Sequence, residues 1–168
     1  FRGTLDGANH TITLALSEQN SFSDYDALFG SLLYATIKDI VLNVSASYPG
    51  DIAAGYWNDD VYGGACGLAT SVGTSTVISN VTLNGSFQFG TWGSSGGGLV
   101  AVAYAGAKFY DCVNNTSVSI KQYYRDGAGG YFIWGGIAVQ TSGAASYPVP
   151  DALFVRCVNN ATVTMEYP

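Results

Sequence analysis

Seven asparagines in this chain stand two residues before a serine or threonine, the pattern that accepts an N-linked sugar. Because the chain contains only ten asparagines, this share predicts glycosylation, and with it an extracellular or cell-surface location. The alternative interpretation is that a β-rich repeat places Asn at turns and Thr in strands, so that the triplets follow from the fold alone. The seven residues are Asn9, Asn43, Asn80, Asn84, Asn114, Asn115 and Asn160.

The other residue types that carry chemistry do not form a catalytic or metal-binding pattern. The close acidic pairs, Asp24/Asp26 and Asp59/Asp60, lie in loop-like segments without the further oxygen donors that a calcium ion requires. His10 is the only histidine, which excludes a catalytic triad or a multi-histidine metal site built from this chain. No Cys-x-x-Cys, P-loop or dinucleotide motif occurs. We therefore predict a protein that is not an enzyme and has no cofactor and no metal ion.

Charge and composition exclude several kinds of partner. The net charge is −6 and the six Lys and Arg residues are spread singly, so no basic stripe predicts nucleic-acid binding. Gly, Ser or a charge interrupts each apolar run before it reaches membrane-spanning length, and we expect no membrane insertion within this segment. The chain starts inside a strand-like motif, and we interpret residues 1–168 as one domain, either a processed chain or a segment of a longer extracellular protein.

The elements that would position the asparagines form a repeat. Four segments share an apolar strand that leads to a sequon asparagine, and a glycine-rich strand precedes each of them. The asparagine-bearing segments are 36–45, 77–86, 108–117 and 153–162, and the glycine-rich strands are 28–32, 63–69, 96–101 and 135–139. This order is typical of a chain that revisits the same faces, and it predicts an all-β parallel β-solenoid of about four to five irregular coils. The alternative is an antiparallel β-sandwich, which short strands and many turns also fit.

Period-two alternation assigns the residues of each repeat to two faces. One predicted inward ladder contains Ile40, Val81, Cys112 and Cys157, and the next contains Leu42, Leu83, Asn114 and Asn159. The amides of Asn114 and Asn159 are expected to satisfy each other, which makes Asn114 the poorest sugar acceptor. The outward face carries the main predicted glycosylation sites, Asn43, Asn84, Asn115 and Asn160, with Asn80 and Asn9 next in order.

Cysteines and clustered aromatic residues have structural explanations. Three cysteines are too few for a disulfide scaffold, and we expect all three to be reduced and buried, with Cys112 and Cys157 in adjacent strands. Packing or subunit contact explains the aromatic clusters 56–57, 123–124 and 131–134, and sugar binding is the alternative.

The repeat resembles a known family. The opening Phe1-Arg-Gly-Thr-Leu-Asp-Gly, the Ala27-Leu-Phe-Gly stretch, the Gly-Gly-Leu and Gly-Gly-Ile strands and the two Cys-Val-Asn-Asn segments are similar to surface proteins with GLUG-type repeats. The resemblance implies a right-handed parallel β-helix, an adhesin-like surface location and no catalytic residues. Ala101 and Ala138 depart from the closing glycine of that repeat, and the column of sequons is not a hallmark of the family.

Neither end of the sequence shows an obvious cap, which predicts self-association. We expect the chain to be a structural protomer of an extracellular, N-glycosylated fibre or stalk that stacks end to end into filaments. Segments 1–16 and 153–168 would meet, with Leu14, Leu16, Val163 and Met165 continuing the core. The alternative is a carbohydrate- or surface-binding adhesin module, in which flanking repeats cover both ends.

Overall fold

The computed structural model describes residues 1–17, 25–48, 64–89, 95–121, 133–134, 136–142 and 151–166. In these ranges the chain forms strands and turns without a helix. Each strand pairing in them is parallel. The predicted all-β class with parallel strands is therefore confirmed, and the antiparallel pairing of a β-sandwich does not occur in this part of the chain.

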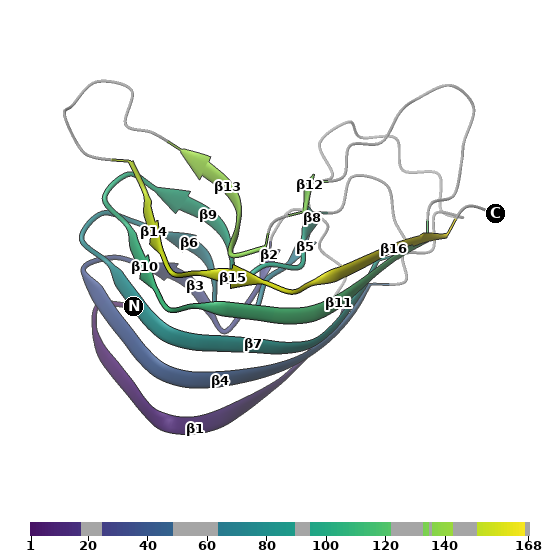
Figure 1. Ribbon diagram of the computed structural model, residues 1–168, viewed down its shortest axis with the longest axis horizontal. Helices are drawn as coiled ribbons and strands as arrows, with labels where there is room; N and C mark the ends of the chain where they lie inside the picture. Colours follow the sequence, from purple (N-terminus) through teal and green to yellow (C-terminus); the bar gives the residue numbers. More distant parts are fainter. Residues whose placement is uncertain are drawn as a thin grey trace.

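Three sheets contain all the described strands (Figure 1). The long sheet consists of β1 (Gly3–Ser17), β4 (Ala35–Tyr48), β7 (Val77–Phe89), β10 (Lys108–Tyr110), β11 (Val113–Lys121), β14 (Leu153–Val155), β15 (Val158–Asn159) and β16 (Thr162–Glu166). A second sheet contains β2 (Tyr25–Asp26), β5 (Gly64–Ala65), β8 (Ser95–Gly96) and β12 (Ile133–Trp134). The third contains β3 (Phe29–Leu32), β6 (Ala69–Val72), β9 (Val100–Tyr104) and β13 (Ala138–Ser142). After β1, the chain visits the second, third and long sheets in that order four times.

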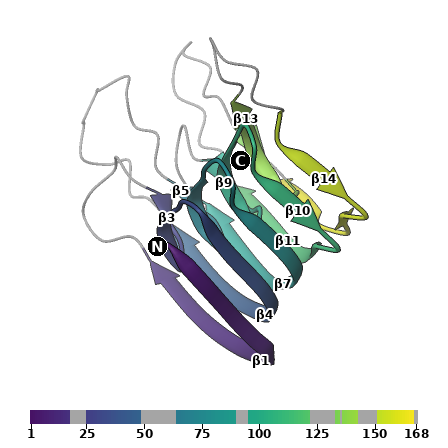
Figure 2. The same cartoon turned by 90° about the vertical axis from the view of Figure 1, so that its left-hand side faces the viewer.

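The long sheet stacks equivalent residues of the repeat side by side, and its outer edges are β1 and the segment β14 to β16 (Figure 2). Leu42 is in register with Leu83, Leu83 with Asn114, and Asn114 with Asn159, which confirms that predicted ladder residue by residue. In the neighbouring ladder Ile40 is in register with Val81. The amide of Val158 donates to the carbonyl of Cys112 at 2.8 Å, which joins the two cysteine-bearing segments.

A corner bends each strand position of the long sheet, and a residue with positive φ stands at each corner (Figure 1). The φ angles are 55° at Asp39, 50° at Asn80, 53° at Asp111 and 51° at Arg156. Asn and Asp tolerate this left-handed conformation better than other residues with a side chain, which explains three of the four positions. In β1 the corner contains two more residues than in β4, because Asp6 pairs with Lys38 and His10 with Ile40.

One apolar core is shared by all three sheets. Fully buried side chains come from the long sheet, as in Phe87 and Ile120, and from the third sheet, as in Leu32 and Val72. Glycine permits a close approach in the bend between β5 and β6, because a Cβ added at Gly67 would overlap the side chain of Leu83. Gly67 therefore lets this bend lie directly against the inward face of the long sheet.

Candidate functional site

The four main sequon asparagines form one outward column of the long sheet. Asn43 is in register with Asn84, and Asn84 with Asn115. Their side-chain amides bond in series: Asn84 Nδ2 donates to Asn43 Oδ1 at 3.2 Å, Asn115 Nδ2 to Asn84 Oδ1 at 3.1 Å, and Asn160 Nδ2 to Asn115 Oδ1 at 2.9 Å. All but the half-buried Asn84 are exposed, so the predicted sugar acceptors do face outward.

The hydroxyl residues that complete these four sequons stand in the next outward column. Ser45 is in register with Ser86, Ser86 with Ser117, and Ser117 with Thr162. The sequons are therefore stacked as pairs of columns, asparagine beside hydroxyl. Chemically, the asparagine column can accept sugars at Nδ2, and its amide chain also links four neighbouring strand positions.

The inward amides behave differently from the expectation. Asn114 is fully buried, and its Nδ2 donates to the carbonyl oxygens of Gly97 at 3.2 Å and Gly136 at 2.8 Å. Its Oδ1 accepts from the hydroxyl of Thr116 at 2.8 Å and from the amide of Thr116 at 3.1 Å. The prediction that Asn114 and Asn159 satisfy each other is wrong, because the buried Asn114 amide bonds instead to Gly97 and Gly136, which lie in the segments that join the second sheet to the third. The burial of Asn114 agrees with its low rank as a sugar acceptor.

Asn80 and Asn9 lie in the corner region rather than on the flat arm. Asn80 Nδ2 donates to Asp39 Oδ1 at 2.7 Å and contacts Asn9 Oδ1 at 3.5 Å. Both asparagines are exposed, and both have positive φ, 50° for Asn80 and 62° for Asn9. Both asparagine side chains are thus accessible, but the Asn80 amide already donates a hydrogen bond to Asp39.

Ion pairs tie the corners of neighbouring strands together. Lys38 Nζ lies 2.6 Å from Asp6 Oδ2 and 3.4 Å from Asp39 Oδ2. Arg156 makes a bidentate contact with Asp111, through Nε at 2.6 Å and Nη2 at 2.7 Å. These hydrogen bonds lower the pKa of Asp6 and of Asp111 from the ordinary range. Because the pairs are exposed, they set local geometry more than stability.

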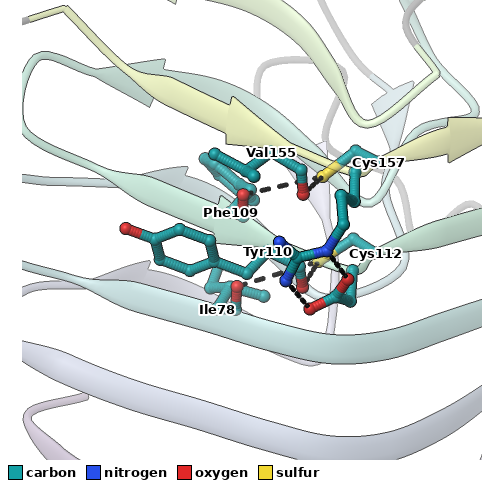
Figure 3. A network of polar contacts seen from close by, with 8 residues as sticks. Ile78, Phe109, Tyr110, Cys112, Val155 and Cys157 are labelled. Carbon is teal, nitrogen blue, oxygen red and sulfur yellow. Dashed lines mark hydrogen bonds and ion pairs between the residues drawn. The ribbon is translucent and has the colours of Figure 1, made fainter.

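The cysteines are free, and two of them are buried. Cys112 and Cys157 lie in neighbouring strand positions, where Cys112 Sγ contacts the carbonyl of Tyr110 at 3.4 Å and Cys157 Sγ that of Val155 at 3.6 Å (Figure 3). Burial, reinforced by the nearby Cys157, raises the pKa of the Cys112 thiol to about 12, and burial also raises that of Cys66. The prediction that all three are buried is wrong for Cys157, which is half-buried because it lies in an edge strand position.

Thiol labelling without denaturant should therefore distinguish the three cysteines. At pH 8 we expect Cys157 to react with a small thiol reagent, while Cys66 and Cys112 react at least about a hundredfold more slowly, because they are buried and stay protonated. Peptide mass spectrometry at successive times measures each rate. In denaturant all three should react alike, and equal rates in the native protein would contradict the described packing.

The two edges of the long sheet expose side chains that belong to core ladders. Val163 is in register with Val118 and Met165 with Ile120, both buried, yet Val163 is 48% and Met165 44% exposed. At the other edge Leu14 and Leu16 are half-buried against the core. Each predicted assembly residue is thus an inward side chain of an edge strand. Among the described residues, each of these edge strands pairs with a strand on one side only.

The described residues cover the other predicted sites only in part. In the described ranges no three His, Cys, Asp or Glu side chains gather as a metal ion would need, and no helix is long and apolar enough to cross a membrane. The pair Asp59/Asp60 and the aromatic clusters at 56–57 and 123–124 lie outside these ranges.

No family model, curated protein or solved structure matches the chain. Its function is therefore inferred from its own residues and their geometry.

Proposed function

We propose that this chain is a non-enzymatic structural protomer of an extracellular, N-glycosylated fibre or stalk. Its three sheets would close into a right-handed parallel β-helix of about four to five coils. Copies would stack end to end, so that the open edges of one molecule continue the sheets of the next. The observation that carries this proposal is that both edges of the long sheet leave ladder side chains of the core exposed or half-buried.

The geometry of the last strand supplies a test of end-to-end growth. The amides of Val158 and Asn160 donate toward β11, each at 2.8 Å. Because successive amides of a strand alternate sides, the N–H of Val163 points to the open edge, where a second copy would add a strand. Val163→Pro removes this donor and leaves the donors toward β11 in place.

Val163→Pro should therefore block filament growth at this end without unfolding the protein. Sedimentation and electron microscopy measure growth, and circular dichroism checks the fold. Val163→Ala is the matched control, because it keeps the N–H, and it should still form filaments. A folded Val163→Pro protein that grows like the parent would show that the strand edge is not the growing surface.

Glycosylation of the outward column is the second part of the proposal. We expect sugars on Asn43, Asn84, Asn115 and Asn160, then on Asn80 and Asn9, and least on the buried Asn114. Neighbouring column positions are about 4.8 Å apart, so sugars on adjacent asparagines crowd each other and each position should be only partly occupied. Such sugars would shield the sheet from aggregation and proteolysis.

Peptide N-glycosidase treatment of protein from its natural source tests this part. The intact mass should fall, and each sugar-bearing asparagine should become aspartate, which peptide mass spectrometry locates. Conversion should be found in the outward column and not at Asn114. An unchanged mass would rule out N-linked sugars and leave the amide chain as the role of the column.

The alternative function, a carbohydrate- or surface-binding adhesin module, is favoured by one observation. The four outward positions Thr11, Thr13, Ala15 and Ser17 of the flat arm and their register partners include no charged residue and consist mostly of Ser, Thr and Asn. They are Thr11, Thr13, Ala15 and Ser17, Val41, Asn43, Ser45 and Ser47, Thr82, Asn84, Ser86 and Gln88, Val113, Asn115, Ser117 and Ser119, and Val158, Asn160, Thr162 and Thr164. Hydroxyls and amides can hydrogen-bond a neutral polysaccharide. Isolated, surface-anchored molecules in place of filaments would favour this role.

A further inference from the structure

The ladders of the long sheet define where a second copy would add its first strand. One inward ladder runs through Leu16, Ala46, Phe87, Val118 and Val163. If β1 of a second copy continues this ladder beside β16, its Leu16 lies next to Val163. The apolar side chains that each edge exposes would then cover each other, as they do at every internal step of the sheet.

The outward asparagine column supports the same register. Thr13 is in register with Asn43 at one end of this column, and Asn160 stands at the other end. Asn160 Oδ1 accepts no hydrogen bond from a described residue, whereas its Nδ2 donates to Asn115. In the continued register the hydroxyl of Thr13 from the second copy would face Asn160 Oδ1 and could donate to it.

Charged residues at the two edges are complementary in this register. Asp6 is in register with Lys38, and along the same ladder Ser79, Tyr110 and Val155 follow. Asp6 of the second copy would therefore lie beside Val155, next to the corner residue Arg156. Within one copy Asp6 pairs with Lys38 and Arg156 with Asp111, and because Asp6 is 47% and Arg156 68% exposed, each side chain can make a second contact across the junction.

A second pair of opposite charges has the same alignment. Arg2 precedes Gly3, which is in register with Ala35, and its guanidinium lies over the ring of Tyr34, 5.5 Å from the centroid. Thr4 and Leu153 belong to one ladder, through Thr36, Val77 and Lys108. Arg2 and Asp151 each stand two residues before these ends, so extending the register beyond the strands aligns them. Both charged residues are exposed. The register thus sets Arg2 against Asp151 and Asp6 against Arg156.

From this alignment we infer that two charge pairs, Arg2 with Asp151 and Asp6 with Arg156, fix the register and polarity of the junction between two copies of this chain. The inference rests on the proposed end-to-end assembly and adds what makes it specific. Opposite charges across an interface guide encounter and select the partner, whereas like charges in the same places reject it. The junction therefore accepts an N-terminal edge against a C-terminal edge in one register.

Charge reversal at one edge at a time tests this inference. One variant carries Arg2→Glu and Asp6→Arg, and the other carries Asp151→Arg and Arg156→Glu. Each variant alone brings like charges together, so its critical concentration for filament formation should rise at least about tenfold. An equimolar mixture restores opposite charges at every junction and should form alternating filaments within about twofold of the parent concentration. The chain with all four substitutions should also assemble alone.

The possible outcomes separate this inference from the proposal on which it rests. Circular dichroism first shows that each variant is folded. Filaments from the single-edge variants at the parent concentration, or a mixture that fails to recover, would overturn the charge pairs and leave end-to-end assembly intact. A parent chain that stays monomeric, as expected if further coils of a longer protein cover its edges, would overturn both. Added salt should reduce the difference in critical concentration between the single-edge variants and the parent, because it screens the charges.

Discussion

Gly85→Ala should be strongly destabilising, with a loss of about 3 kcal/mol or more in the free energy of unfolding. Gly85 has φ of 114°, a conformation that residues with a side chain rarely adopt. A Cβ at this position would overlap the backbone carbonyl of Val44, its register partner in the adjacent strand. Because backbone in the middle of the sheet cannot move without breaking its ladder, the strain cannot be relieved locally.

Gly30→Ala is the matched control for this substitution. Gly30 is also a strand residue, but a Cβ added there meets no atom within 4 Å. The free energy of unfolding of the Gly30→Ala protein should differ from that of the parent by less than about 0.5 kcal/mol. Urea denaturation of the two variants and the parent measures both effects. Equal midpoints for the two variants would contradict the close approach of β4 and β7.

Asn114→Leu should have the second largest effect, a loss of about 2–4 kcal/mol. The substitution makes position 114 match its register partner Leu83, which by pattern alone would suggest a better core. It also removes a donor from the buried carbonyl of Gly97 and the half-buried carbonyl of Gly136, and an acceptor from the buried Thr116. Unsatisfied buried polar groups cost more than the added apolar contact supplies.

The neighbouring Asn115 provides the control for Asn114. Asn115→Ala removes two exposed amide contacts, to Asn84 and Asn160, and should cost about 1 kcal/mol or less. Denaturation midpoints of the two variants would separate an interior hydrogen-bond network from a surface amide chain. A stabilised Asn114→Leu protein would show that the buried amide is dispensable.

The register of the long sheet could be predicted from sequence because the repeat stacks equivalent residues. Aligning the four asparagine-bearing segments by pattern already pairs Leu42 with Leu83 and Asn43 with Asn84, as the structure does. Period-two alternation then separates inward from outward residues without further information. The all-β class with parallel strands and the outward column therefore follow from local pattern alone.

Contacts between different sheets could not be predicted in this way. The partners of Asn114 are carbonyls of glycines between the strands of the second and third sheets, and alternation along one strand says nothing about what faces it. The corners had a usable signal, because Asp39, Asn80 and Asp111 are residue types that favour positive φ. Arg156 had no such signal, and its ion pair with Asp111 appears only in three dimensions.

Electron cryo-microscopy of the concentrated, purified chain tests end-to-end stacking most directly. The long sheet has five successive strand positions, which at about 4.8 Å each predict filaments with an axial rise of about 24 Å per molecule. Strands should lie perpendicular to the filament axis, and density should continue from β16 of one copy to β1 of the next. Isolated particles at all concentrations, or filaments whose axial rise does not match five strand positions, would contradict the account.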